Sequence, residues 1–314
     1  MYPMGKKLDA IQVIGLGQAC VDYLGTLNAF PHEDEKAELT DLHIQCGGPA
    51  STALVTLSRF GVSTAFLGSI SDDPFGVKIF NTLKNEKIGV SSLKITPGYT
   101  SQFAFIAITK ETGKRTIFWH RGTVPHLLKR DVDIRQFPKA RILHTDGLMV
   151  EASIEAARQA QSIGMTVVMD AGTMRDGSKE LSKFVTILIA SETFASPLVG
   201  RDAPHDIALH ALRELGPEQV VITLGANGSI GLDNQGVIIR QKAFPVSAVD
   251  TTGAGDVYHG GYIYGLLQGW DMRDCMRFAS AAAALKCTHV GAQNGIPNLK
   301  DIKKVIIRSI QYRG

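Results

Sequence analysis

The chain has 314 residues, with 33 Lys and Arg against 30 Asp and Glu, so its formal net charge at pH 7 is +3. This even balance favours neither nucleic acid nor an acidic membrane surface as a partner. The sequence contains no apolar stretch of about 18 residues, and its four cysteines form no CxxC pair, which predicts a cytoplasmic protein with reduced thiols.

The first third of the chain alternates predicted strands and helices, at residues 11–17, 49–60, 64–68 and 75–88. Such alternation is typical of a parallel sheet covered by helices. Two segments interrupt it: residues 22–46 lack a helical period, and residues 102–121 alternate around a turn, which predicts a hairpin. We expect these lid segments, about 22–46 and 99–122, to form a small sheet over a cleft.

The alternation then resumes along the rest of the chain. Strands are predicted at 141–144, 166–169, 185–190 and 220–223, a hairpin within 228–244, and helices at 153–164, 203–215, 254–267 and 272–286. Two helices therefore close the predicted series. No linker divides the sequence, so we expect one α/β domain over residues 1–314, with a mostly parallel central sheet.

The most informative motif is Asp-Thr-Thr-Gly-Ala-Gly-Asp at residues 250–256, directly before a predicted helix. A turn of small residues that opens a helix aims backbone N–H groups at one point, where the helix dipole favours negative charge. Gly253, Ala254 and Gly255 let a phosphoryl group approach the backbone, and Asp256 is placed to act as a general base. The alternative is an ordinary glycine-rich turn with a capping Asp.

This string closely resembles the C-terminal signature of ribokinase-like (PfkB-type) carbohydrate kinases, and the resemblance covers essentially the whole chain. It implies a three-layer α/β/α ribokinase-like fold with a small β-sheet lid, and transfer of a phosphoryl group from ATP, with Mg²⁺, to a sugar hydroxyl. Asp256 would deprotonate that hydroxyl, and the backbone of residues 253–255 would stabilise the transferring phosphoryl group.

The resemblance also implies a set of sugar-binding residues. Cys46 to Thr52 resembles the N-terminal Gly-Gly signature of the family, in which Gly47 and Gly48 open a helix that faces the sugar. Thr52 stands where many members have Asn, and Asp22 matches an acidic position that binds sugar hydroxyls. Arg115 and Arg121, in the predicted hairpin, are candidates for contact with an anionic substrate, although such charges are often only solvated.

The expected nucleotide-binding residues come from four segments of the second half of the chain. The loop after the strand at 220–223 resembles the nucleotide loop of the family, and the small residues Ala279 to Ala284 would either let adenine lie flat against a helix or serve close helix packing. Arg175 follows a strand end, and Glu192 lies where many members carry an Asn-x-x-Glu motif tied to magnesium. The candidates are Thr223, Gly225, Gly228, Glu192, Arg175 and Ala283.

The resemblance further implies a potassium site. Asp250 and the carbonyl of Thr252 precede the anion hole, and the loop at 289–295, with Gly291 and Gly295, resembles the segment whose carbonyls hold potassium. We therefore expect K⁺ to raise kcat. The alternative is that Asp250 only caps the turn and the loop is structural.

Several alternatives remain open for the function. A dinucleotide-dependent oxidoreductase is disfavoured because Cys20 occupies the place of the third glycine after Gly15 and Gly17. A catalytically silent sugar-binding or regulatory protein and a nucleoside kinase share the fold. The pattern around Thr52 and residues 284–288 looks most like the subgroup with sulfofructose kinase, and the hairpin at 113–117 like ketohexokinases. We also expect a homodimer formed through the lid, because its strand edges and aromatic side chains would otherwise face water.

Overall fold

A nine-stranded sheet forms the centre of the molecule in the computed structural model, which describes residues 10–112 and 114–311. Strands β11 to β5 of this order are parallel, and β12 and β13 add an antiparallel edge. From edge to edge the sheet contains β13 (Ile238–Gln241), β12 (Ser229–Leu232), β11 (Gln219–Thr223), β10 (Ile187–Ser191), β9 (Thr166–Ala171), β8 (Ile142–Thr145), β1 (Val13–Leu16), β4 (Thr64–Ile70) and β5 (Leu93–Ile95).

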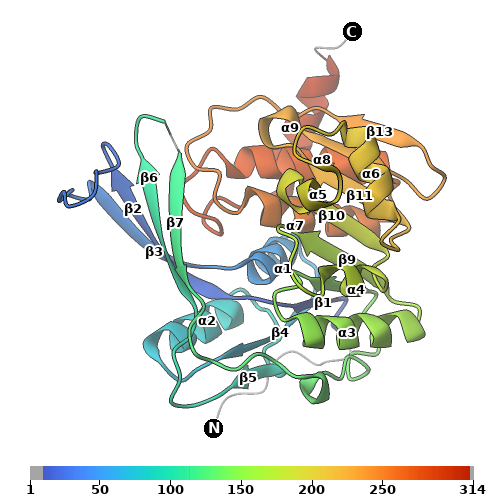
Figure 1. Cartoon of the computed structure of the whole chain (residues 1–314), viewed down its shortest axis with the longest axis horizontal. Coiled ribbons are helices and arrows are strands. Elements are labelled where there is room, and N and C mark those ends of the chain that lie inside the picture. Colours follow the sequence, from blue (N-terminus) through green and yellow to red (C-terminus); the bar gives the residue numbers. More distant parts are fainter. Residues whose placement is uncertain (1–9, 113, 312–314) are drawn as a thin grey trace.

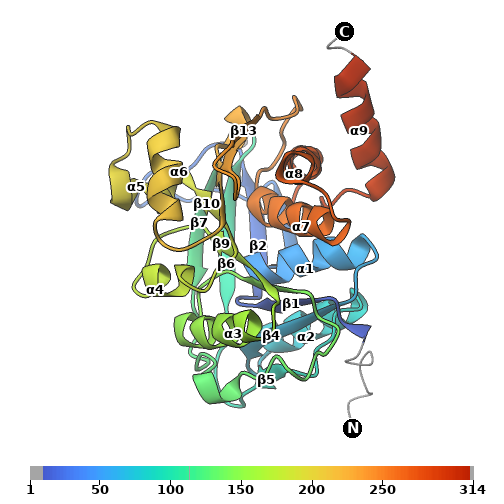
Figure 2. The same cartoon turned by 90° about the vertical axis from the view of Figure 1, so that its right-hand side faces the viewer.

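Helices cover both faces of this sheet, which confirms the predicted three layers (Figures 1 and 2). Alternate residues of one strand enter different cores: Val167 packs with the α3 side, and its neighbour Val168 packs with the α1 and α7 side. One face carries α3 (Val150–Ser162), α4 (Ser178–Ser182), α5 (Glu192–Val199) and α6 (His205–Arg213), and the other carries α1 (Pro49–Arg59), α2 (Pro74–Asn85), α7 (Ala254–Leu267) and α8 (Met272–Lys286).

A separate four-stranded sheet projects beside this body and confirms the predicted lid (Figure 1). Its order is β3 (Asp41–Gly47), β2 (Cys20–Leu27), β6 (Phe103–Thr109) and β7 (Arg115–His120). Asp22, Ala104 and Trp119 lie in one row across the sheet, and the adjacent row contains Tyr23, Phe105 and Phe118. Because neighbouring residues of a strand face opposite sides, the two rows lie on opposite faces of the sheet. In the second row Phe118 is exposed, whereas Tyr23 packs against Phe75 with ring centroids 6.2 Å apart.

The end of the chain differs from the prediction. Helices α7 and α8 have the predicted bounds, but a third helix, α9 (Leu299–Gln311), follows them. Its residues Ile302, Val305 and Ile306 recur at helical spacing and pack against the core cluster that contains Phe278 of α8. Within the described ranges 10–112 and 114–311, none of the helices has the length and apolar character that crossing a bilayer requires.

Candidate active site

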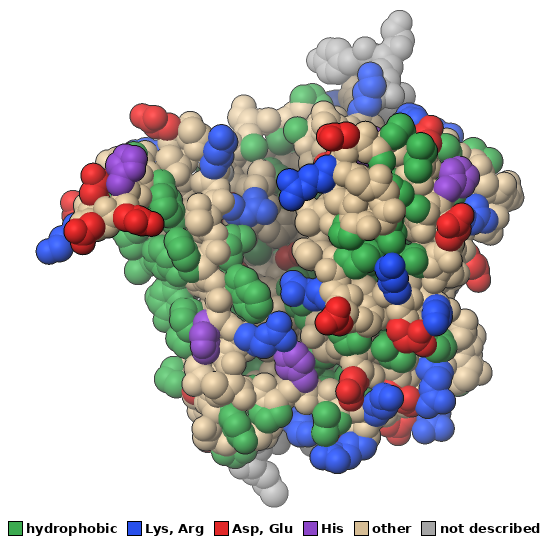
Figure 3. Space-filling view, viewed as in Figure 1, with side chains coloured by type: hydrophobic (Ala, Val, Ile, Leu, Met, Phe, Trp, Pro, Cys, Tyr) green, Lys and Arg blue, Asp and Glu red, His purple; other side chains and the backbone are tan. Residues whose placement is uncertain are grey.

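Two pockets lie on either side of the N-terminus of α7. The lid pocket, of about 360 Å³, lies between the lid and the body, and Figure 3 shows the molecule hollowed there, with Lys and Arg around the opening. It is lined by Gln18, Pro49, Gln102, Ile117, Trp119, Arg121, His126, Asp146, Leu148, Met149, Asp170, Gly172, Thr173 and Arg175. The small-residue pocket, of about 440 Å³, is lined by Thr223, Gly225, Ala226, Gly228, Ala243, Phe244, Pro245, Val246, Ala248, Thr251, Ala254, Gly255, Tyr258, Ser280, Ala283, Ala284 and Cys287.

The turn at residues 253–255 stands between these pockets. Gly253 precedes α7 with φ 76°, and a Cβ there would come within 2.5 Å of the Cβ of Ala292, so only glycine fits. A Cβ at Gly255 would enter open space, and Gly255 lines the small-residue pocket. The N–H groups of Gly255 and Asp256 lie in the first helical turn, which provides them with no acceptor. The geometry is that of an anion-binding helix N-terminus.

Asp256 is partly buried in the first turn of α7. Burial, followed by the negative charge of Asp170, raises the pKa of its carboxyl group to about 7. A carboxylate with a pKa near neutrality accepts a proton more readily than an ordinary Asp and is still largely ionised slightly above pH 7.

A buried ion pair lies beside Asp256. The Nε2 of His259 is 3.2 Å from Oδ1 of Asp170, at the end of β9. Burial opposes the charge of both groups, but their attraction dominates, so the pKa of His259 is raised and the pKa of Asp170 is lowered. His144 packs against His259, with ring centroids 5.7 Å apart, and burial lowers its pKa to about 4. The ion pair with Asp170 therefore favours the protonated form of His259, whereas burial favours the neutral form of His144.

Two further acidic residues lie near the lid pocket. Asp22, predicted to bind the substrate, is buried in β2 and accepts a hydrogen bond from Sγ of Cys20 at 3.1 Å. Asp146 accepts from the backbone N–H groups of Gln18 at 2.6 Å and Leu148 at 3.0 Å. Burial raises the pKa of both carboxyl groups to about 6. Sequence reasoning missed Asp146, although it follows a strand of the parallel sheet, the position that ligand-facing residues occupy in such folds.

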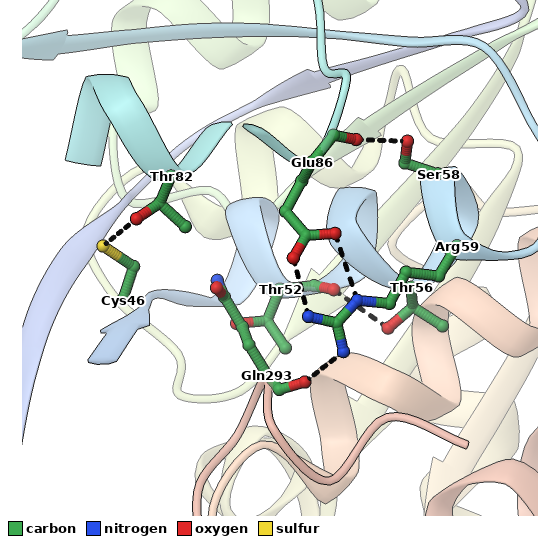
Figure 4. A network of polar contacts seen from close by, with 8 residues as sticks. All are labelled: Cys46, Thr52, Thr56, Ser58, Arg59, Thr82, Glu86 and Gln293. Atoms are coloured by element: carbon green, nitrogen blue, oxygen red, sulfur yellow. Dashed lines mark hydrogen bonds and ion pairs between the residues drawn. The ribbon is translucent and has the colours of Figure 1, made fainter. Parts of the chain in front are cut away.

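The Gly-Gly segment supports this region without lining it. A Cβ at Gly47 would collide with Oδ2 of Asp22, and Gly48, with φ 98°, passes too close to the carbonyl of Gln18 for any side chain. Thr52 is buried in α1 and its Oγ1 accepts from Nε2 of Gln293 at 3.5 Å, as Figure 4 shows. The expected sugar contact of Thr52 is therefore not supported, because its hydroxyl faces the loop at 291–295.

The three candidate arginines lie at different pockets. Arg121 and Arg175 both line the lid pocket, so Arg175 lies on the other side of the turn from the small-residue pocket where we expected it. Arg115, on β7, donates a hydrogen bond to Oγ1 of Thr251, at the edge of the small-residue pocket. Arg115 therefore bridges the lid to the residues just before the anion hole.

Four of the predicted nucleotide-binding residues, Thr223, Gly225, Gly228 and Ala283, meet in the small-residue pocket. Glu192 does not: it is exposed in the first turn of α5 and its Oε1 is 3.1 Å from Nε2 of His205. Ser191 caps α5 by accepting from the N–H of Phe194, whose ring is buried in the core. The structure does not support the expected cofactor role of Glu192, because Glu192 lines neither pocket, and this role stays a prediction.

The residues predicted to hold potassium lie close together, and the side chain of Lys286 lies among them. Asp250 Oδ1 accepts from N and Oγ1 of Thr252 at 2.8 and 2.6 Å, and Oδ2 accepts from the N–H of Gly291 at 2.7 Å. The ammonium group of Lys286 donates to the carbonyl of Asp250 at 2.7 Å and lies 3.7 Å from Oδ2. A Cβ at Gly295 would lie 3.1 Å from Cε of Lys286. These residues do not fit a potassium ion, because a lysine already provides the positive charge there.

The sequence of this site matches a known family. The model of the pfkB family of carbohydrate kinases matches residues 11–299. The chain belongs to this family. As a pfkB kinase it is a transferase that phosphorylates a sugar or a nucleoside, and kinases of this fold use ATP.

Individual relatives agree with this assignment. The ribokinase of Haemophilus influenzae is 29% identical over 296 residues, which cover 91% of this chain and 95% of the relative. A 5-dehydro-2-deoxygluconokinase of Clostridium perfringens is 27% identical over 330 aligned positions, covering 98% of this chain and 96% of the relative. The structure of Arabidopsis thaliana ribokinase with ribose and ATP superposes with a TM-score of 0.82 at 24% identity, over 95% of this chain and 99% of that chain. The expected sulfofructose kinase or ketohexokinase subgroup stays a prediction.

The fold also decides one of the alternatives. After β1, residues Gly15 and Gly17 lead into the lid strand β2, not into a helix, so the phosphate-binding turn of a dinucleotide-dependent oxidoreductase is missing at this point.

The small-residue pocket fits an adenine nucleotide. Gly225 and Gly255 both leave open space where a side chain would stand. Ala283 and Ala284 of α8 add a flat helical surface to the wall of the same pocket. Among the residues that the structure describes, no three His, Cys, Asp or Glu side chains gather as a metal site. Phosphate oxygens are ligands that Mg²⁺ prefers, so the ATP phosphates would supply part of its coordination.

Proposed function

We propose that this kinase transfers the γ-phosphoryl group of MgATP to a hydroxyl group of a sugar derivative that carries an anionic group. The observation that carries the proposal is the charge of the lid pocket, whose wall contains Arg121 and Arg175 as well as Asp146 and Asp170. A guanidinium group recognises a carboxylate, sulfonate or phosphate through two parallel hydrogen bonds.

The acidic residues of the lid pocket already have partners. Asp170 pairs with His259, and Asp146 accepts from two backbone N–H groups. Within residues 10–112 and 114–311, neither Arg121 nor Arg175 forms an ion pair with a carboxylate. Arg121 lies over the ring of Trp119 at 5.6 Å, which orients its guanidinium group at the pocket wall. Both positive charges are available to an acceptor that is itself negative.

In the proposed reaction Asp256 removes the proton of the acceptor hydroxyl group as its oxygen forms a bond to the γ-phosphorus. The bond from this phosphorus to the bridging oxygen breaks, and ADP leaves with the electron pair. The N–H groups of the turn at 253–255 stabilise the negative charge of the phosphoryl oxygens. Gln102, whose buried Oε1 has no partner in the described part of the chain, lines the lid pocket and is suited to accept from another hydroxyl group of the sugar.

A panel of acceptors tests the proposal by coupled detection of ADP. Sugar acids, sulfonated hexoses and phosphorylated hexoses are compared with their neutral parents and with nucleosides. We expect kcat/KM to be highest for an anionic acceptor. Arg175→Gln and Arg121→Gln should each raise its KM by about 10- to 100-fold, the effect of losing a charged hydrogen bond. Arg135→Gln, at an exposed ion pair outside both pockets, is the control. Equal kcat/KM for neutral and anionic acceptors would refute the anionic class.

We also propose that the outer face of the lid forms a homodimer. Leu42, Ile44 and Phe118 are each about half exposed there, at 47%, 46% and 53%, and Phe30 stacks on Phe118 with ring centroids 6.4 Å apart. Figure 3 displays this side of the molecule as a band of hydrophobic side chains. An apolar face of this kind is favourable only when a partner covers it. Sedimentation at micromolar concentration tests it: Phe118→Asp should shift a dimer to a monomer, and a monomeric native protein would contradict the proposal.

A further inference from the structure

Lys286 is a buried cation at the base of the anion-hole turn. It is the last residue of α8, its side chain has no exposed surface, and the side chain of Asp250 has none either. Its ammonium group donates to the backbone carbonyl of Asp250 at 2.7 Å, with the carboxylate of the same residue at 3.7 Å. A lysine without solvent contact is rare unless its charge is paired.

The position of this ammonium group relates it to the catalytic turn. Asp250 holds Thr252 through two hydrogen bonds and Gly291 through a third. Thr252 directly precedes Gly253, which in turn packs against Ala292. The positive charge of Lys286 therefore lies at the point where the segment before α7 meets the loop at 291–295.

We propose that the Lys286 ammonium group is a covalently attached substitute for a monovalent cation: it orders the turn at 250–253, aims the N–H groups of the anion hole, and makes the kinase independent of potassium. This inference rests on the proposed function. An ammonium group offers one positive charge and three N–H donors, which suit the carbonyl and carboxylate oxygens of one residue. Because it is tethered, its occupancy does not depend on the concentration of any ion.

A potassium ion at these oxygens would also be opposed electrostatically. It would share the single carboxylate of Asp250 with Lys286 and stand next to a like charge in a buried environment, where charges are weakly screened. The surroundings of Gly295 are also filled, since a Cβ added at this residue would lie 2.8 Å from the carbonyl oxygen of Lys286 and 3.1 Å from its Cε. The expectation that K⁺ raises kcat is thus replaced: the kcat of the native protein should not depend on K⁺.

The walls around Lys286 are held independently of its side chain. The N–H groups of Val249 and Asp250 donate to the carbonyl of Cys287 at 2.7 and 3.2 Å. On the other side, Arg59 donates to the carbonyl of Gln293 at 2.5 Å while a bidentate pair with Glu86 fixes its guanidinium group (Figure 4). Removal of the lysine side chain should therefore leave a cavity lined by oxygens, which a potassium ion can enter.

The test compares kcat in potassium chloride and tetramethylammonium chloride at equal ionic strength. The native protein should give the same kcat in both salts within about twofold. Lys286→Ala should lose about tenfold or more in the organic salt, as expected for a misaimed anion hole, and recover saturably with K⁺. Lys286→Met fills the same space without charge and is the matched control: its kcat should fall without recovery.

Thermal unfolding provides a second readout that requires no turnover. K⁺ should raise the Tm of Lys286→Ala saturably, because an ion that binds only the folded state stabilises it, and should not raise that of the native protein or Lys286→Met. Lys286→Ser, which leaves nearly the same cavity as Lys286→Ala and adds a hydroxyl oxygen, is a second variant and should also respond to K⁺. Absence of phosphorylation with every acceptor would refute the proposed function. The Tm measurement would still test whether Lys286 substitutes for a cation, because it requires no turnover.

Four results would overturn the inference. They are a saturable increase of native kcat by K⁺ beyond about twofold, an unchanged kcat of Lys286→Ala in the organic salt, a K⁺ response of Lys286→Met equal to that of Lys286→Ala, and the absence of any K⁺ effect on kcat or Tm in both Lys286→Ala and Lys286→Ser. If neither variant of the fourth result folds in either salt, the inference is also overturned. K⁺ would then fail to stabilise the folded state, which a cation site in the cavity should do.

Discussion

The two pockets beside α7 differ in the origin of their residues. The small-residue pocket is built almost entirely from the chain after Thr223 and consists mainly of Gly, Ala and other small side chains. The lid pocket collects charged and aromatic side chains from the region between Gln18 and Arg175, including the lid strand β7. One pocket suits a constant ligand with a flat ring, and the other suits a ligand that is selected by charge and shape.

This difference between the pockets reflects the different requirements of nucleotide binding and acceptor binding in a kinase. Nucleotide recognition requires close approach to backbone, so it restricts residues to small types at fixed positions after a strand. Acceptor recognition requires particular functional groups at particular points, which loops and a projecting sheet can supply in many ways. Variants on each side should therefore affect different kinetic constants.

The largest effect is expected where the pockets meet. Asp256→Asn removes the proposed general base but keeps the size of the side chain, so kcat should fall by about 10²- to 10⁴-fold while the fold remains. The affinity for ATP, measured by calorimetry, should change little, because Asp256 does not line the small-residue pocket. Asp233→Asn, in the turn between β12 and β13, is the control. Near-native turnover of Asp256→Asn would show that another group takes the proton.

The next effect should be confined to the nucleotide. Ala283→Leu adds a branched side chain to the wall of the small-residue pocket, and overfilling a packed site costs about 1–3 kcal/mol, or about 10- to 100-fold in the KM for ATP. The KM for the acceptor should remain the same. Arg273→Leu, exposed on the same helix, is the matched control. An equal rise of both KM values would contradict the separation of the pockets.

The success of the sequence analysis follows the same division. The turn at 253–255 and the residues Thr223, Gly225, Gly228 and Ala283 were predictable because each depends on local backbone chemistry. Thr52 and Glu192 were placed by similarity to family motifs, and the folded chain gives them other partners, Gln293 for Thr52 and His205 for Glu192. Arg175 was placed by its position after a strand end, which does not indicate which of the two pockets it lines. Lys286 carried no local signal, since only the folded chain brings it to Asp250.

The fold was predictable for a related reason. The periodicity of buried strands and amphipathic helices depends only on residues that are close in sequence. The bounds of α7 and α8 could therefore be predicted correctly. The short elements α4, β5 and α5 were missed because three to eight residues carry too little periodicity. The missed helix α9 was predictable, since Ile302, Val305 and Ile306 recur at helical spacing.

The pH dependence of kcat/KM should report the base at the junction of the pockets. With the pKa of Asp256 near 7, the ionised fraction, and so kcat/KM, should rise about tenfold per pH unit below 7 and level off above it. His259→Asn removes the positive charge that lowers this pKa and leaves Asp170 unpaired, so the midpoint should move to higher pH by about one unit. His205→Asn, at the exposed pair with Glu192, is the control. A midpoint near 4 would contradict the raised pKa of Asp256.

The smallest effect tests whether the inner face of the lid serves the acceptor alone. Trp119 lines the lid pocket beneath the guanidinium group of Arg121, whereas Phe118, the preceding residue of β7, lies on the opposite face of the sheet. A cation and an aromatic ring at an exposed site attract each other by about 0.5–1 kcal/mol, or about two- to fivefold in binding. Trp119→Leu should therefore raise the KM for the acceptor by about this factor and leave the KM for ATP and kcat unchanged. Phe118→Leu is the matched control, because it alters a similar apolar area on the same strand. If both variants raise the acceptor KM equally, the lid acts through its general stability; if only Trp119→Leu does, the side chain of Trp119 contributes to the acceptor pocket itself.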